Sequence, residues 1–243
     1  MSLALFTDAL DRIAAKDEQV RFWLRDDDAV MPTPALEKLL ALTAARGVPL
    51  TLAVIPRDTG RPLAEALDRH DDVSVALHGW SHGNHAGPTE KKQELGVHRP
   101  LAETFAELSA GFEKLSALYP RQFIAMLVPP WNRIAPEVIE ALPSLGLRSL
   151  SVFGPENQAP LPLLNTHVDI MNWHGARGGR DPEELFAELA LLIEAPGRPA
   201  AIGILTHHLV HDDNAWGFLE ALFQAGSGRP ACRWVSATEA LGR

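Results

Sequence analysis

Apolar residues along the chain follow two patterns, which are short continuous runs and longer stretches with helical spacing. Short runs bounded by turn residues predict buried strands, and apolar residues repeated every three or four positions predict amphipathic helices. The predicted strands are residues 21–24, 50–55, 73–77, 123–128, 201–205 and 233–235, with weaker signals at 148–153 and 168–171. The predicted helices are an N-terminal one ending near Ala15 and residues 34–46, 62–69, 100–118, 136–142, 182–194, 216–224 and 237–241.

Strands and helices therefore alternate in seven or eight units. Fully apolar strands between amphipathic helices predict a parallel sheet covered by helices. At 243 residues, with no linker or repeat, we expect one α/β domain over residues 1–243, a distorted (β/α) barrel of seven or eight parallel strands. A doubly wound open sheet is the alternative, although no Gly-rich nucleotide motif follows any strand.

Charge and cysteine content narrow the class of protein. The formal net charge is -9 and basic residues form no runs, which argues against a nucleic-acid or anionic-membrane partner. Cys232 is the single cysteine, so neither an intramolecular disulfide nor a cysteine-based zinc site is expected. The N-terminal segment has no signal-peptide pattern, and the expected location is the cytoplasm.

Polar residues gather where the predicted strands end, which is where parallel barrels build their active sites. These segments are Asp26-Asp27-Asp28, the His-rich stretch from His78 to His85, Pro129 to Asn132, Asp169 to His174, and Thr206-His207-His208. Adjacent carboxylates occur in solvated loops, but in a partly buried site they require a cation. His78 and His82 together with a strand-end aspartate supply two imidazoles and one carboxylate, which favours a metal site over two unrelated loop histidines.

Two further groups of residues have an ordinary structural explanation and a functional one. His207, His208 or the nearby His211 could be a general acid or a hydrogen-bonded core histidine. Trp131 and Trp173 could belong to the core or form an apolar groove for a sugar ring.

Taken in order, the five segments resemble the motifs of the polysaccharide deacetylases, also called NodB-homology or carbohydrate esterase family 4 enzymes. The family's Thr-Phe-Asp-Asp-Gly is similar to Arg25-Asp26-Asp27-Asp28-Ala29, and its His-Ser/Thr-x-x-His to the segment His78–His82. Its Arg-x-Pro-Tyr/Trp resembles Val128-Pro129-Pro130-Trp131, its Asp-Trp resembles Asn172-Trp173, and its Leu-x-His resembles Leu205-Thr206-His207. The resemblance covers most of the chain and implies the family's distorted barrel.

The resemblance also implies roles for individual residues. Asp28, His78 and His82 would bind a divalent metal, for which we expect Zn²⁺, with Asp27 as general base and His207 as general acid. Pro130, Trp131, Trp173 and Asp169 would contact substrate. Asp26-Asp27 could serve in place of Asp27-Asp28, and His208 in place of His207.

Two positions depart from the family's pattern. Val128 replaces the arginine that holds the catalytic aspartate, and Asn172 replaces the aspartate that tunes the catalytic histidine. We hypothesise that Arg25 or Arg133 compensates for the arginine and Asp169 for the aspartate.

The expected function is hydrolysis of an acyl group, an N-acetyl group above all, from a sugar or related small amide. Ureide or cyclic amide hydrolysis is an alternative on the same fold. A carbohydrate-binding relative with impaired catalysis is another, which the two departures support. A non-haem iron oxygenase would also use two histidines and one carboxylate, but the α/β pattern disfavours it.

Overall fold

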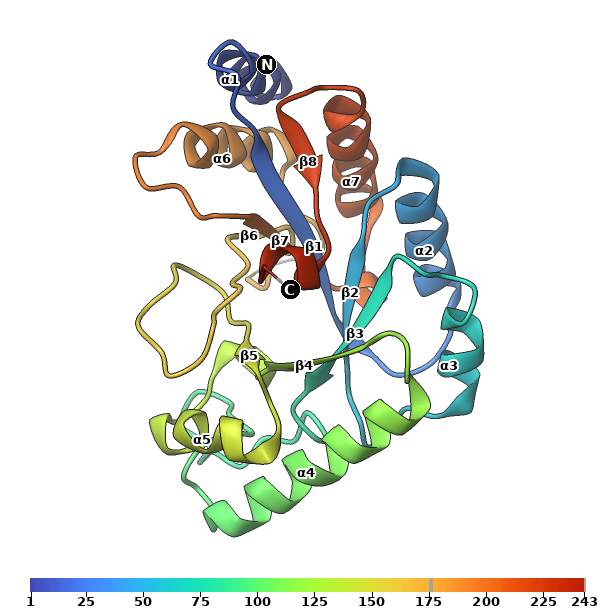
Figure 1. Cartoon of the computed structure of the whole chain (residues 1–243), viewed down its shortest axis with the longest axis vertical. Coiled ribbons are helices and arrows are strands. Elements are labelled where there is room, and N and C mark those ends of the chain that lie inside the picture. Colours follow the sequence, from blue (N-terminus) through green and yellow to red (C-terminus); the bar gives the residue numbers. More distant parts are fainter. Residues whose placement is uncertain (175–176, 243) are drawn as a thin grey trace. The chain divides into compact units, whose positions relative to one another are not determined.

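The computed structural model describes residues 1–174 and 177–242, in which eight strands follow one another along the chain with a helix between most of them (Figure 1). The chain divides into two compact units. The first consists of Met1–Asp26, Thr33–Leu50 and Thr166–Arg243, and the second of Asp27–Pro32 and Thr51–Asn165.

The first unit is built on β1 (Val20–Ala29), whose residues up to Asp26 belong to it. Parallel pairing joins β1 to β7 (Ile202–Thr206) and to β8 (Cys232–Trp234), and β7 to β6 (Val168–Asp169). Its helices are α1 (Ser2–Ala14), α2 (Pro34–Arg46), α6 (Pro182–Glu194), α7 (Asp213–Gly226), α8 (Ala237–Ala240) and a 3₁₀ turn η3 (His208–Val210). Aromatic rings of α1, β1 and α6 meet in the core, at Phe6, Phe22 and Phe186.

The second unit pairs β3 (Val73–His78), β4 (Phe123–Val128) and β5 (Ser149–Leu150) in parallel. It also holds β2 (Leu50–Val54) from Thr51 onward. Its helices are α3 (Arg61–Leu67), α4 (Leu101–Leu118), α5 (Pro136–Ala141) and the 3₁₀ turns η1 (Pro130–Asn132) and η2 (Leu142–Leu145). In Figure 1, α4 runs along β3 and β4, and the two strands contact it.

Local chemistry explains where the helices begin and end. Thr33 caps α2 by accepting a hydrogen bond from Leu36 N, and Gly47 ends this helix in the left-handed conformation. Asp181 caps α6 by accepting from Glu183 N, with Pro182 at the first helical position, where the predicted helix also begins. The eight strands and the parallel pairs described above confirm the predicted α/β class with seven or eight parallel strands.

The first strand is longer than predicted, because Asp26, Asp27 and Asp28 lie within β1 and do not follow it. Charged residues normally mark the end of a strand, but here Arg25 and Asp26 are fully buried and the ladder continues to the pair Asp26–Thr206. The weaker strands are shorter than expected, with two residues each in β5 and β6.

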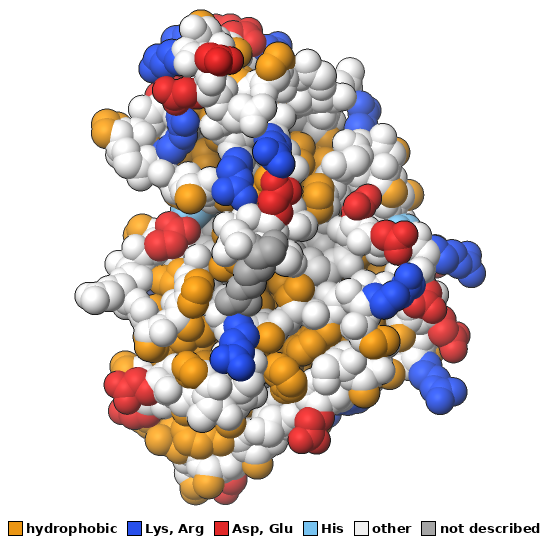
Figure 2. Space-filling model, viewed as in Figure 1, with side chains coloured by type: hydrophobic (Ala, Val, Ile, Leu, Met, Phe, Trp, Pro, Cys, Tyr) orange, Lys and Arg blue, Asp and Glu red, His pale blue; other side chains and the backbone are white. Residues whose placement is uncertain are grey.

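No helix among residues 1–174 and 177–242 is long and apolar enough to cross a bilayer. On the face seen in Figure 2, basic and acidic side chains are interspersed among apolar ones.

Candidate metal centre and neighbouring residues

Three side chains of the second unit converge as the sequence predicts. Asp28 comes from β1, His78 ends β3, and His82 lies in the turn that follows. Asp28 Oδ1 is 3.1 Å from His78 Nε2 and 3.4 Å from His82 Nε2. One ligand atom from each residue lies within 4.8 Å of the others, so this cluster could hold a metal ion.

The orientation of His78 suits a ligand. Its Nδ1 lies 2.9 Å from the carbonyl oxygen of Val128, which can only accept, so Nδ1 carries a proton and donates it. In the neutral ring, Nε2 then has a lone pair that faces the Asp28 carboxylate. Two acceptors at this distance repel each other unless a proton or a cation lies between them, and a bound cation would satisfy both.

The protonation of the two histidines differs. Burial alone lowers the pKa of His78, but its hydrogen bond to Asp28 and the charges of Asp27 and Asp28 outweigh burial, and the pKa is raised. Burial and the neighbouring His78 lower the pKa of His82. The aspartates thus favour a positive charge at this place, and the lowered pKa of His82 favours the neutral imidazole that can bind a cation.

A buried glutamate that the sequence analysis missed fixes the turn from Gly79 to His82. Glu94 is fully buried and accepts hydrogen bonds from Ser81 N at 2.7 Å, Ser81 Oγ at 3.0 Å and Trp80 N at 3.3 Å. Glu94 lies in a loop without secondary structure, 14 residues from Trp80, and no local pattern marks it. Glu94 thus anchors the backbone of Trp80 and Ser81, which leads into His82.

The backbone at this cluster adopts conformations that L-residues seldom take. Among the described residues, positive φ angles occur at six non-glycine positions, of which Asp28, His82, Trp131 and Asn132 belong to this part of the chain. Such conformations cost on the order of 1–3 kcal/mol each and concentrate at functional sites. In the turn after β3, Gly79 and His82 take the left-handed conformation, whereas Gly83 does not.

Two of the predicted substrate-contacting residues adjoin the cluster. The Trp131 ring lies 4.3 Å from the His82 ring, centroid to centroid. Pro130 is buried and lies against Gly79, since a Cβ at Gly79 would come within 2.8 Å of the Pro130 ring. Trp131 therefore forms a wall beside a proposed metal ligand, and Pro130 supports the turn.

In the first unit, Asp26 and His208 form a buried pair. Asp26 Oδ2 accepts from His208 N at 2.8 Å, and Asp26 Oδ1 is hydrogen-bonded to His208 Nδ1. Both side chains are at most 1% exposed. Burial raises the pKa of Asp26, although the His208 charge and hydrogen bond oppose it. His207 is more exposed than the buried His208, and Asp28 is the aspartate that lies with His78 and His82 in the candidate metal cluster.

His207 lies beside the other predicted substrate residues. The Trp173 ring meets the His207 ring edge-on at 4.6 Å, and Trp173 Nε1 donates to Asp169 Oδ2 at 2.8 Å. Trp173 thus contacts both His207 and Asp169, and the replacement of the missing aspartate by Asp169 stays a prediction. Asn172 Oδ1 accepts from His174 N and closes its own loop.

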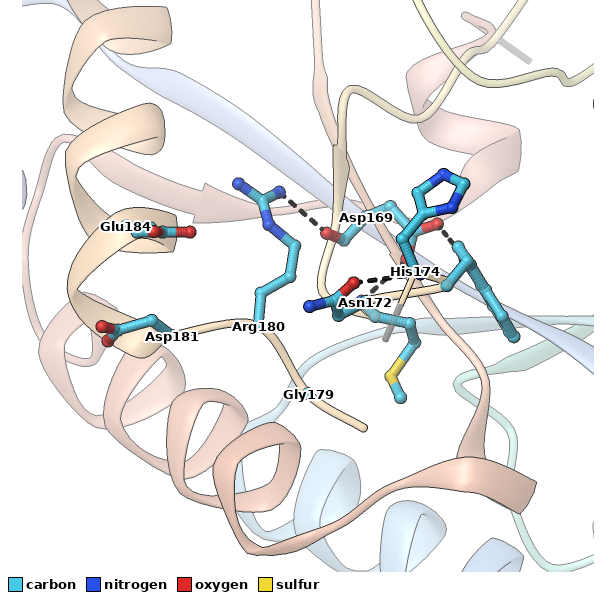
Figure 3. A pocket seen from close by; sticks show the side chains of 9 residues that line it. Asp169, Asn172, His174, Gly179, Arg180, Asp181 and Glu184 are labelled. Carbon is cyan, nitrogen blue, oxygen red and sulfur yellow. Dashed lines mark hydrogen bonds between the residues drawn. The ribbon is translucent and has the colours of Figure 1, made fainter. Parts of the chain in front are cut away.

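A pocket of about 530 Å³ opens next to this group (Figure 3). Arg180 projects toward it between α6 and Asp169, donating to the Asp169 carbonyl oxygen at 3.0 Å and to Glu188 at 2.8 Å. Trp173, which is 43% exposed, is one of the pocket's lining residues. The remaining lining residues are Met171, Asn172, His174, Gly179, Asp181 and Glu184.

The two arginine candidates differ in burial. Arg25 is fully buried in β1, whereas Arg133 donates to the Lys92 carbonyl oxygen in an exposed hydrogen bond. A buried guanidinium requires a compensating acceptor, so Arg25 fits the hypothesis better.

Comparison with solved structures relates this chain to proteins of one fold. No family model and no curated protein sequence matches this chain. Among solved structures, T48 deacetylase with substrate has a TM-score of 0.59 at 18% identity, covering 93% of this chain and 92% of that one. A family 4 carbohydrate esterase from Streptomyces lividans, in complex with acetate, has a TM-score of 0.59 at 16% identity, covering 88% and 91%. A family 4 acetyl xylan esterase from Clostridium thermocellum, in complex with a cobalt ion, has a TM-score of 0.55 at 12% identity, covering 91% and 90%.

These similarities extend over nearly the full length of each chain, and the predicted NodB-type fold is confirmed. The chain has the (β/α) barrel fold of the polysaccharide deacetylases and family 4 carbohydrate esterases.

Proposed function

We propose that this chain is a divergent member of the polysaccharide deacetylase family, a metal-dependent hydrolase that removes an N-acyl group from a sugar or related small amide. The observation that carries the proposal is the convergence of Asp28, His78 and His82 within 4.8 Å. The neighbouring structures, which include a deacetylase with its substrate and an esterase with a cobalt ion, support it. The substrate would be a cytoplasmic glycan precursor or a small metabolite.

The residues present fit a divalent ion, for which we propose Zn²⁺. Two imidazoles and one carboxylate leave coordination positions for water or substrate, which is the composition of hydrolytic sites. When bound, the ion would polarise the acyl carbonyl group and make a water molecule more acidic.

The protein's own groups complete the reaction. Asp27 is 3% exposed and adjoins Asp28 in the chain, and it accepts a proton from the attacking water. The water oxygen bonds to the acyl carbon, the C–N bond breaks, and His207 gives a proton to the amine nitrogen. The products are a carboxylic acid, such as acetate, and a free amine. We propose Trp131 and Trp173 as the aromatic side chains that contact the substrate.

Metal analysis with matched variants tests this proposal. We expect near-stoichiometric divalent metal in the wild type and in the control His70→Ala/His85→Ala, and little metal in His78→Ala/His82→Ala. The loaded wild type should release acetate from N-acetyl sugars. Absence of metal from all three proteins after incubation with Zn²⁺ would overturn the proposal. Bound iron with oxygen consumption would favour the oxygenase alternative.

A carbohydrate-binding relative is the second candidate. It is favoured by Val128 and by the Asn172 side chain, which serves its own loop through His174 N. Calorimetric binding of N-acetyl sugars by the metal-loaded protein, without acetate release, would identify this function.

A further inference from the structure

We propose that Asp26 is a positioning residue that fixes His207 by binding the next residue, His208, at two points. The inference rests on the proposed function, in which His207 supplies a proton to the leaving amine. In the motif that the first strand resembles, a phenylalanine takes the place of Asp26. A carboxylate at this place is therefore a feature of this chain and calls for a physical explanation.

The contacts of Asp26 are made with both the backbone and the ring of His208. Oδ2 accepts from the backbone N–H at 2.8 Å, and Oδ1 is hydrogen-bonded to the ring nitrogen Nδ1. A carboxylate held at both oxygens fixes the rotation of the His208 ring and the path of its peptide group. The direction of the chain as it leaves β7 is thereby set.

His207 lies between two fixed points. On one side, Asp26 and Thr206 form the last residue pair of the β1–β7 ladder. On the other side, His208 is bound to Asp26 and starts the η3 turn. With both neighbours held, the His207 backbone has little freedom, and the edge-on contact with Trp173 at 4.6 Å confines its ring.

Burying the polar side chains of Asp26 and His208 costs free energy. Asp26 is completely buried and His208 is 1% exposed, so both polar groups lose their hydration. Apolar side chains of similar size often replace such pairs without loss of stability, and retained buried polar pairs are best known for fixing a particular geometry. Here the geometry that is fixed is that of the neighbouring, more accessible histidine.

The decisive variant replaces the whole pair by apolar residues, Asp26→Leu/His208→Phe, so that no buried group is left unpaired. Asp26→Asn is the conservative variant, because its amide can keep both hydrogen bonds after a change of the His208 tautomer. Tyr119→Phe is the matched control, since it removes the buried hydrogen bond between Tyr119 and Thr59 in the other unit.

Leaving-group dependence distinguishes positioning from a loss of stability. An amide needs a proton from His207 to release its amine, whereas the phenolate of 4-nitrophenyl acetate departs unprotonated. We expect the apolar pair to lower kcat for an N-acetyl sugar about 10- to 100-fold and for the aryl ester less than about threefold, with KM and metal content unchanged. Asp26→Asn should restore most of the amide turnover. An equal loss on both substrates would overturn the proposal.

Nuclear magnetic resonance of ¹⁵N-labelled histidine provides a readout that needs no activity. The His207 ring signal, assigned with His207→Gln, should be single and sharp in the wild type and in Tyr119→Phe. It should shift or broaden in the apolar pair variant. An unchanged His207 signal would overturn the positioning role. A wild type that cleaves neither substrate would instead count against the proposed function, and the ring signal would then decide the positioning role alone.

Discussion

Neighbouring residues of the same type take different environments in this protein. Asp26 is fully buried with His208, Asp27 is 3% exposed, and the Asp28 side chain is 32% exposed beside two histidines. His207 and His208 differ in the same way, since the second is buried and the first borders Trp173. Residue type alone therefore does not determine the role of these groups.

His211 leads to a prediction about stability and pH. Its Nε2 is hydrogen-bonded to Thr206 Oγ1, and its Nδ1 is buried without a partner among the described residues. Burial, followed by the charges of His208 and His207, lowers the pKa of His211 to about 3. The unfolded chain binds this proton below about pH 6.5, so the associated stability is present above pH 6.5 and is lost as the pH falls toward about 3.

Urea unfolding of His211→Gln between pH 7 and pH 5 should therefore show a shallower loss of stability than the wild type. One proton is worth about 1.4 kcal/mol per pH unit, so the difference over this range should approach about 2 kcal/mol. The exposed His85→Gln serves as control and should follow the wild type. Identical slopes for all three proteins would show that His211 has the same pKa in the folded and unfolded states and would contradict the prediction.

At the scale of single elements, the turn after β3 depends on one glycine. Gly79 has φ +57°, and a Cβ there would lie 2.1 Å from Glu94 Oε2 and 2.8 Å from Pro130. Gly47, at the end of α2, has φ +61° with no atom within 4 Å of such a Cβ. The two glycines share a backbone conformation and differ in crowding.

Gly47→Ala should cost about 1 kcal/mol in the free energy of unfolding, the usual price of a left-handed L-residue. Gly79→Ala should cost more and should also weaken metal binding, because the Glu94 anchor of the His82 turn must move. Thermal unfolding and Zn²⁺ titration of both variants test this. Equal metal affinity in the two variants would contradict the role assigned to the turn.

The sequence predicts these elements well where a local signal exists. Thr33 and Gly47 bound α2, and Asp181 and Pro182 begin α6, as their chemistry requires. The end of β1 was missed because the residues Asp26–Asp28 normally end a strand, and only the distant partner His208 explains why the strand continues. Glu94 was missed for the same reason, since its partners Trp80 and Ser81 lie 14 and 13 residues away.

For the whole molecule, one domain over residues 1–243 remains a prediction, and unfolding tests it. Phe6 is fully buried in α1 and meets Phe22 and Phe186. Phe6→Ala should cost about 3–5 kcal/mol in the free energy of unfolding. Leu5→Ala, on the same helix but 50% exposed, is the control and should change it by less than about 0.5 kcal/mol.

If the chain unfolds as one domain, Phe6→Ala should lower the hydrogen-exchange protection of the strands β3 and β4 as much as that of β1. Loss of protection confined to the first unit would contradict the single-domain prediction.

The three consecutive aspartates of β1 also limit which insertions and deletions the strand can accept. Each of the three carboxylates has its own environment at a fixed position of β1. Deletion of one residue between Val20 and Asp26 would move every later carboxylate one step along and turn each side chain to the opposite face. Homologues that keep this chemistry should therefore have neither insertions nor deletions in the first half of β1.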